Sequence, residues 1–173
     1  MLIRRELPSD ESAIRRVHAD AFAPHYPGEQ PVEPQLVDDL RASGAYLGAL
    51  SLIAVSDGEI VGHVCCTRAT LLPREDPVLG LAPLGVRQSH QHRGVGGALM
   101  HAVLGAADAL DEPLVVLLGH LDYYQRFGFR PAAEVGVEPE NPEWSPFFQA
   151  RSLTSYRPEL RGRFRYAQPF DDL

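Results

Sequence analysis

The segment Arg93-Gly94-Val95-Gly96-Gly97 has the residue types and the spacing of an anion-binding loop. Glycines let a ligand approach the backbone closely, and apolar residues at helical spacing follow over residues 94–110. The first turn of such a helix has N–H groups without intrahelical partners, and these favour a phosphate together with the helix dipole. The alternative interpretation is a glycine-rich turn that only permits tight packing.

Two well-known phosphate motifs do not describe this segment. A Walker A loop needs Gly-Lys followed by Ser or Thr, and the chain contains no such triplet. A dinucleotide-binding fingerprint needs Gly-x-Gly-x-x-Gly. The stretch Gly94-Val95-Gly96 supplies the first two glycines, but Leu99 stands at the third position. A different pattern is therefore needed to explain the glycines.

The stretch Gln91-His92-Arg93-Gly94-Val95-Gly96 resembles the acetyl-CoA pyrophosphate loop, Gln/Arg-x-x-Gly-x-Gly, of the GNAT superfamily of N-acetyltransferases. Upstream, Pro83-Leu84-Gly85-Val86 is similar to the fourth strand of these enzymes. Downstream, Tyr123 to Pro131 resembles their Tyr-x-x-x-Gly-Phe segment, and Leu118 to Tyr124 is similar to a run in the YhbS-like branch of predicted acetyltransferases. The order and spacing match the family, and the resemblance is strong over residues 80–131.

The resemblance implies an α/β fold of the GNAT type, with a mixed, splayed central sheet, helices on both faces, and a single domain over residues 1–173. It implies acetyl-CoA as co-substrate and no metal. The pantetheine arm would pair with the fourth strand, and the pyrophosphate would lie in the glycine-rich loop. The residues to which these roles carry over are Leu84, Gly85 and Val86 for pantetheine and the thioester carbonyl, and His92, Arg93, Gly94, Val95, Gly96 and Gly97 for the pyrophosphate.

The reaction that the resemblance implies is transfer of an acetyl group to a primary amine by direct attack in a ternary complex. Tyr124 stands four residues before Gly128, the position of the general acid that protonates the leaving thiolate. The alternative is that Tyr124 only packs under the cofactor. Tyr123 is the stand-in for this role, although we expect its side chain to point elsewhere. The alternative function is a non-catalytic acyl-CoA-binding regulatory or accessory domain.

Two positions depart from the family pattern. Many GNAT enzymes carry an Asn seven residues before the tyrosine, where this chain has Leu117. Many carry a Glu on the fourth strand that helps to deprotonate the amine, but residues 80–86 contain no carboxylate. His63, His120 and Asp122 are therefore candidates for the base, and the choice among them stays open. The missing carboxylate favours the non-catalytic alternative, whereas the tyrosine argues against it.

The elements that must position these residues follow from periodicity and turn signals. Helices are expected over residues 10–22, 33–43, 94–110 and 123–127, and strands over residues 2–6, 50–55, 60–72, 78–86 and 114–118. Pro83 lacks a ladder donor, so its strand should be an edge, bulged or splayed there. Residues 134–148 are rich in proline and glutamate and are expected to cross the surface, and the arginine-rich residues 151–165 predict a solvated face.

Composition excludes several classes of protein. The chain has 173 residues and a formal net charge of -7, so a bulk electrostatic grip on nucleic acid is not expected. No apolar run approaches the roughly 20 residues of a membrane span. No apolar signal region follows the charges of Met1 to Glu6, which predicts a cytoplasmic protein. The adjacent Cys65 and Cys66 offer neither a disulfide framework nor a four-ligand zinc site. The acceptor amine and the oligomeric state, a homodimer included, stay open.

Overall fold

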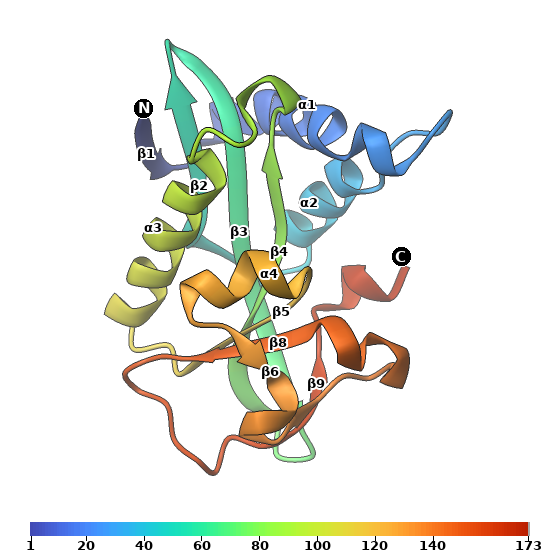
Figure 1. Cartoon of the computed structure of the whole chain (residues 1–173), viewed down its shortest axis with the longest axis vertical. Coiled ribbons are helices and arrows are strands. Elements are labelled where there is room, and N and C mark those ends of the chain that lie inside the picture. The colour runs from blue at the N-terminus through green and yellow to red at the C-terminus, as the bar shows by residue number, and fades with distance from the viewer. Residues whose placement is uncertain (173) are drawn as a thin grey trace.

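The computed structural model describes residues 1–172 as one mixed sheet with helices against both faces (Figure 1). The strands are β1 (Leu2–Arg5), β2 (Tyr46–Ser56), β3 (Glu59–Leu72), β4 (Asp76–Val86), β5 (Leu114–Leu118), β6 (Arg130–Pro131), β7 (Val137–Glu138), β8 (Phe148–Ser152) and β9 (Gly162–Arg165). Their order is β1-β2-β3-β4-β5-β8-β6, and β9 pairs with β3 and β7. The β4–β5 and β7–β9 pairs are parallel, and the others are antiparallel.

Four α-helices accompany the sheet. They are α1 (Glu11–Phe22), α2 (Glu33–Ala42), α3 (Val95–Ala109) and α4 (Leu121–Tyr124). Short 3-10 turns cover Pro8–Asp10, Ala23–His25, Gln88–His90, Gln125–Phe127, Ala132–Val135, Pro142–Phe147 and Gln168–Asp172. The predicted helices and strands are therefore present, and the largest difference is that β2 begins at residue 46 rather than 50. No helix in the described part of the chain is long and apolar enough to cross a membrane.

The main core lies between α3 and one face of β2, β3 and β4 (Figure 1). The apolar stripe of α3 follows the predicted helical spacing, and Leu99, Met100 and Val103 are fully buried. On the opposite face, α1 and α2 form a smaller cluster with the sheet, in which Ile14 and Val37 pack against Ile53 of β2. The sheet is thus buried on both faces, as the resemblance predicted.

The hairpin between β2 and β3 brings the longest strands together. Asp57 and Gly58 both adopt positive φ, 50° and 80°, which is the conformation expected for a two-residue hairpin turn. The register shifts where Ala54 pairs with Gly62 and Val55 pairs with Ile60, so the bulge predicted near Gly62 is present.

β4 diverges from β5 after a very short ladder. Within residues 1–172, the two strands pair only at Leu79 with Val115 and at Gly80 with Val116. The register against β3 shifts at the same level, so that Ala82 and Pro83 face one residue of β3. Pro83 therefore sits in a bulge, where a missing N–H donor costs no ladder bond. The expected splay is confirmed, and it opens a fork between the ends of β4 and β5.

The C-terminal third is more ordered than its composition suggested. Residues 134–148 contain β7 and two 3-10 turns, and Val137 and Phe148 are buried at both ends of this stretch. The arginine-rich segment 151–165 contributes β9, in which Phe164 is buried while Arg163 and Arg165 are exposed. Residues 134–148 therefore run along the surface as expected, anchored by the side chains of Val137 and Phe148, and the arginines of β9 are exposed as expected.

The packing of α3 gives a test of stability. Leu99→Ala removes a fully buried side chain that contacts β3, and we expect the free energy of unfolding to fall by about 3 kcal/mol. Leu110, at the end of the same helix, is 52% exposed, and Leu110→Ala should change this free energy by less than about 0.5 kcal/mol. Urea denaturation measures both, and equal losses in the two variants would contradict the packing described for α3.

Candidate active site

The start of α3 has three main-chain donors without intrahelical acceptors. Gly94 is the N-cap residue with φ 84°, a left-handed conformation that glycine adopts without strain. The first intrahelical bond runs from the Ala98 N–H to the Gly94 carbonyl over 2.9 Å. The N–H groups of Val95, Gly96 and Gly97 therefore lie in the turn that has no intrahelical acceptors, next to the exposed His92 and Arg93. This arrangement suits an anion with several oxygens.

The loop before α3 is braced on both sides. Gln91 Nε2 donates to the carbonyl of Val86 at the end of β4, over 3.0 Å. Gln88 binds the end of α1 twice, because its backbone N–H donates to the Asp20 carboxylate over 2.7 Å and its side-chain amide donates to the Asp20 carbonyl over 2.8 Å. The glycine-rich turn is thus held in place relative to both β4 and α1.

Tyr123 lies closer to the glycine-rich turn than the sequence suggested. A Cβ at Gly96 would collide with the Tyr123 hydroxyl, so this phenol occupies the space above the first turn of α3. The guanidinium of Arg126 stacks over the Tyr123 ring, 4.3 Å from its centre. The expectation that Tyr123 points away from the ligand region is therefore not met, and Arg126 adds a positive charge that motif matching did not find.

The backbone of β4 faces the fork through alternate residues. Arg87 N–H donates to the Val61 carbonyl, and Gly85 stands opposite His63 two residues earlier along the same ladder. In an antiparallel ladder, hydrogen-bonded and free positions alternate. The main-chain groups of Leu84 and Val86 therefore point toward the fork, while those of Gly85 point toward β3. Part of the β4 edge is thus available to a ligand that lies extended along it.

Tyr124 lies on the other side of the fork. Its ring covers Gly119, where a Cβ would collide with it, and it meets the Phe129 ring edge to face at 5.9 Å between centres. Burial raises the pKa of the Tyr124 phenol above its usual value, so the hydroxyl keeps its proton at neutral pH. Tyr166, which sequence reasoning did not single out, packs on Gly80 where β4 and β5 separate. The pKa of its phenol is raised by burial and by the neighbouring Tyr124.

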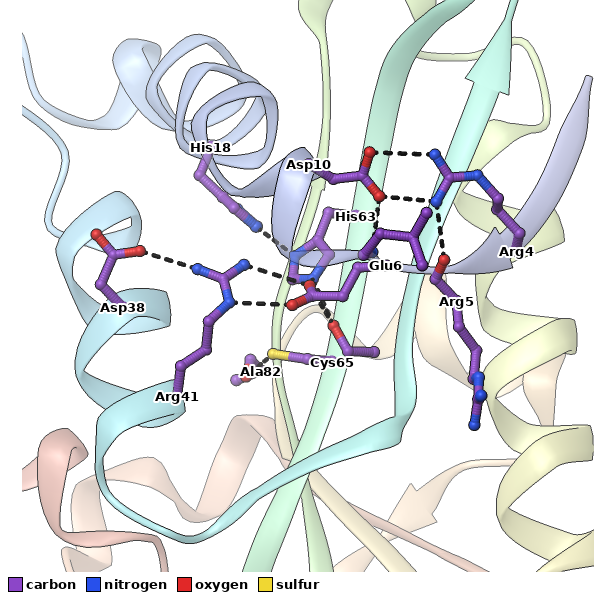
Figure 2. A network of polar contacts seen from close by, with 12 residues as sticks. Arg4, Arg5, Glu6, Asp10, His18, Asp38, Arg41, His63, Cys65 and Ala82 are labelled. Atoms are coloured by element: carbon purple, nitrogen blue, oxygen red, sulfur yellow. Dashed lines mark hydrogen bonds and ion pairs between the residues drawn. The ribbon is translucent and has the colours of Figure 1, made fainter.

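A buried polar network lies on the α1–α2 side of the sheet (Figure 2). Glu6 is its centre. One carboxylate oxygen accepts from Arg41 Nε at 3.0 Å, and the other accepts from Ser51 Oγ at 2.6 Å and lies 3.0 Å from His63 Nε2. Arg41 also donates to Asp38 over 2.9 Å. Burial alone would raise the pKa of Glu6, but the hydrogen bonds from His63, Arg41 and Ser51 outweigh it and hold this pKa well below its usual value.

Two histidines extend this network to β4. His63 Nδ1 lies 2.8 Å from His18 Nε2, and both side chains are fully buried. His18 projects from α1 toward β3, as Figure 2 shows. Its remaining nitrogen, Nδ1, is buried without a hydrogen-bond partner in the described structure. A Cβ at Gly85 would lie 2.7 Å from that nitrogen, so the His18 ring occupies the space that a side chain at this position of β4 would need.

The structure separates the three candidates for the base. His120 and Asp122 are exposed on the loop and the short helix after β5. His63 is fully buried and reaches β4 only through His18. Sequence reasoning missed His18 because it lies on the apolar face of an amphipathic helix, where a histidine looks like an ordinary core residue. Cys65 donates to the Ala82 carbonyl over 3.3 Å, and burial raises the pKa of its thiol to about 12, which disfavours a nucleophilic role.

The described residues offer no group of three or more His, Cys, Asp or Glu side chains that are placed to hold a metal ion. Arg68 and Glu112 form an ion pair at 2.7 Å.

The chain matches the model of the Acetyltransferase (GNAT) family over residues 13–129. Among curated proteins it is 36% identical to the uncharacterized N-acetyltransferase YjhQ of Escherichia coli K12, over 93% of this chain and 89% of that protein. It is 30% identical to the uncharacterized N-acetyltransferase YhbS of the same organism, over 88% of this chain and 87% of that protein.

Two solved structures have the same architecture over nearly the whole chain. The GNAT family N-acetyltransferase YhbS from Escherichia coli, in complex with CoA, superposes with a TM-score of 0.87 at 28% identity, over 98% of this chain and 91% of that one. A GNAT family acetyltransferase from Brucella melitensis, in complex with acetyl-CoA, superposes with a TM-score of 0.79 at 32% identity, over 98% and 97% of the two chains.

The buried carboxylate gives a test of the polar network. Glu6→Gln leaves His63 without a charged acceptor and leaves Arg41 with Asp38 alone, and we expect the free energy of unfolding at pH 7 to fall by about 3 kcal/mol, the scale of a broken buried ion pair. The folded protein lowers the pKa of Glu6, so this contribution is complete above the unfolded value of about 4.3 and declines as the pH falls below it.

The difference between wild type and Glu6→Gln should therefore narrow in acid, as measured by urea denaturation at several pH values. Glu59→Gln is the matched control, because Glu59 pairs with Arg87 at the surface and its side chain is 69% exposed. We expect it to cost less than about 1 kcal/mol. A Glu6→Gln variant as stable as Glu59→Gln would contradict the role of Glu6 as the centre of this network.

Proposed function

The chain is a member of the GNAT acetyltransferase family, and from this premise we propose that it transfers an acetyl group from acetyl-CoA to a primary amine by direct attack in a ternary complex. The observation that carries the proposal is the fork between β4 and β5, whose open backbone edge leads to the free N–H groups at the start of α3. An extended ligand that ends in phosphates fits such a path. Transfer needs no metal in this mechanism.

The pyrophosphate is assigned to the glycine-rich turn. Val95, Gly96 and Gly97 contribute N–H donors, and Gly94 provides the left-handed turn that aims them. His92 and Arg93 lie exposed beside these N–H groups and add side-chain hydrogen-bond donors. Tyr123 and Arg126 approach the same turn from α4 and the 3-10 turn after it. The fit rests on donors that the fold leaves without protein partners.

The pantetheine arm is assigned to the open edge of β4. Leu84 directs its main-chain groups toward the fork and Val86 directs its N–H there, whereas the Val86 carbonyl already accepts from Gln91. An extended chain in the fork thus gains strand-like hydrogen bonds. Gly85 serves through its small size rather than through its own N–H, which is directed toward β3. The free N–H groups of β4 are also the nearest backbone donors for negative charge that develops on the thioester oxygen.

Tyr124 is assigned as the general acid. Its phenol lies at the fork and keeps its proton, because burial raises its pKa. A protonated phenol can give its proton to sulfur as the carbon–sulfur bond breaks. The non-catalytic alternative, an acyl-CoA-binding domain, leaves this hydroxyl without a task. Thiol release from acetyl-CoA in the presence of a panel of amines distinguishes the two, because a binding domain releases none.

One variant tests the assignment of the pyrophosphate to the start of α3. Gly97 has no atom within 4 Å of a built Cβ, so Gly97→Glu adds a carboxylate at the start of α3 without a collision. Glutamate in the first helical turn stabilises the helix, yet it places a negative charge where the phosphates would bind. We expect the Kd for acetyl-CoA, measured by calorimetry, to rise at least tenfold, which corresponds to about 1.4 kcal/mol.

Gly105→Glu is the matched control for this variant. Gly105 lies on the same helix, is exposed, and also has open space around a built Cβ. We expect its Kd to stay within about twofold of wild type. An unchanged affinity in Gly97→Glu would contradict the assignment of the phosphates to this turn, and equal losses in both variants would point to a general effect of charge.

Another variant tests the assignment of Tyr124 as the general acid. Tyr124→Phe keeps the ring that packs on Gly119 and removes only the hydroxyl. We expect kcat to fall by roughly 10²- to 10⁴-fold, the scale of a lost general acid, with little change in the KM for acetyl-CoA. Because burial raises the pKa of this phenol above its usual value of about 10, the wild-type kcat should not decline between pH 7 and 10 through its ionisation.

Tyr123→Phe is the paired variant, with a different expected signature. The Tyr123 hydroxyl lies against Gly96, so its loss should act on the KM for acetyl-CoA and leave kcat near the wild-type value. Steady-state kinetics separate the two parameters. If Tyr123→Phe loses kcat while Tyr124→Phe keeps it, the acid is Tyr123, and if neither loses kcat, the proton comes from another donor.

A further inference from the structure

We propose that Glu6, His63 and His18 form a proton relay that takes up the proton which the acceptor amine must lose at β4. This inference rests on the proposed transferase function and names the base that the sequence left unassigned. Its starting observation is the unpartnered Nδ1 of His18, fully buried against Gly85 of β4. A buried polar atom without a partner costs about 1–3 kcal/mol, so its retention points to a task.

The hydrogen bonds fix the positions of the protons along this chain. Glu6 carries no proton at neutral pH, because its pKa is held low, so it only accepts. Ser51 Oγ lies 2.6 Å from a Glu6 oxygen and must donate to it. His63 Nε2 lies 3.0 Å from the same carboxylate oxygen and 2.9 Å from Ser51 Oγ. The carboxylate has no hydrogen and the Ser51 hydroxyl already donates to it, so His63 Nε2 carries the hydrogen whether it donates to Glu6 or to Ser51.

The tautomer of His63 then determines that of His18. A neutral His63 with a proton on Nε2 has a lone pair on Nδ1. His18 Nε2 lies 2.8 Å from that Nδ1 and therefore donates its hydrogen to it. His18 is left with a lone pair on Nδ1, the atom that faces Gly85. The network thus ends in a basic nitrogen at the strand assigned to the thioester.

Arg41 favours the neutral state of this pair and Glu6 favours the charged state, and burial outweighs the effect of Glu6. Burial lowers the pKa of both His18 and His63, and for His18 the neighbouring His63 and the Arg41 guanidinium of α2 lower it further. Glu6 raises both pKa values. From α1 itself His18 meets the Phe22 ring, with 5.9 Å between ring centres, and from β4 it meets the backbone of Gly85. Both imidazoles are therefore in the base form at neutral pH.

The proton balance of the transfer closes through this relay. An ammonium N–H bond breaks and its proton bonds to His18 Nδ1. The Nε2 proton of His18 shifts to His63 Nδ1, so the positive charge comes to rest beside the Glu6 carboxylate. The amine nitrogen then bonds to the acetyl carbon, the carbon–sulfur bond breaks, and Tyr124 gives its proton to sulfur. The proton that nitrogen loses on becoming an amide restores Tyr124. After the product leaves, the proton on His63 Nδ1 returns to His18 Nε2 and His18 Nδ1 gives its proton to water in the fork, so both rings regain their resting tautomers.

Glu6 forms the end of the relay that lies away from β4. The side chain of Glu6 is 8% exposed, whereas His18 and His63 are fully buried. Tyr46 and Arg41 flank Glu6 and are half-buried. Glu6 is thus the member of the relay nearest to bulk water, at the opposite end from β4. In this arrangement His63 and Glu6 position and polarise His18, which is the proton acceptor.

The test compares His18→Gln with wild type across pH. Thiol release from acetyl-CoA is measured with glucosamine, spermidine and an alanine-initiated peptide as acceptors, from pH 6.5 to 10.5. For the amine with the highest turnover, we expect kcat/KM for the amine to fall at least 100-fold at pH 7, while the calorimetric Kd for acetyl-CoA stays within about twofold. The loss should shrink to within about threefold at the highest pH, where the free amine no longer needs a base.

His101→Gln is the control, because His101 is an exposed histidine of α3 outside this network, and it should match wild type at every pH. His63→Gln, which removes the polarising partner, should give the same pH-dependent recovery with a smaller loss at pH 7. A loss in His18→Gln that is equal at all pH values indicates a structural role and overturns the relay. Full activity of His18→Gln overturns it as well.

A second measurement is independent of turnover. Nitrogen-15 NMR of the histidine side chains of wild type at pH 7 should show His18 and His63 neutral, each with its proton on Nε2. A proton on Nδ1 of either ring overturns the relay, whatever the kinetics show. If the wild-type protein binds acetyl-CoA but releases no thiol with any of the three amines, both the proposed function and the catalytic role of the relay are contradicted. If wild type and His18→Gln are both active, only the relay is contradicted.

Discussion

The separation of β4 from β5 after two paired residues is the constraint on which the rest of the site depends. Parallel strands in the middle of a sheet normally continue their ladder, because unpaired backbone groups are costly when buried. Here the bulge at Pro83 turns β4 away, and Tyr166 packs on Gly80 where the strands part. The Cys65 thiol satisfies the Ala82 carbonyl inside the bulge. The fold thus opens its own sheet, and the freed donors become a place for an extended ligand.

The buried carboxylate of Glu6 fixes the position of α2 against the sheet. Glu6 follows β1, yet its partners come from α2, β2 and β3, so one charged group joins four elements. Taking a carboxylate out of water is offset only when its oxygens are saturated with donors. Arg41, Ser51 and His63 supply those donors, and this saturation fixes the position of α2 and the orientation of His63. The arrangement of α2 and His63 against the sheet therefore depends on this one buried carboxylate.

Short-range patterns in the sequence predicted the helices, strands and turns that short-range interactions determine. The helix after Gly94 follows from its apolar spacing, the hairpin from Asp57-Gly58, and the glycine-rich turn from a motif of consecutive residues. The contact between His18 and His63 could not be found in this way, because the two residues are 45 positions apart and meet through the packing of α1 on the sheet. Tyr166 was missed for the same reason. Residues that act together across elements leave no short-range signal, and only the topology brings them into contact.

Gly85 shows how the two halves of the site constrain each other. Its neighbours Leu84 and Val86 pack against the α3 core and direct their backbone toward the fork. On the opposite face the His18 ring lies so close to Gly85 that any side chain would displace it. The glycine in β4 is therefore required by the histidine of α1 rather than by a ligand in the fork. A side chain at Gly85 has no room beside the His18 ring, which also explains why β4 has no carboxylate of its own there.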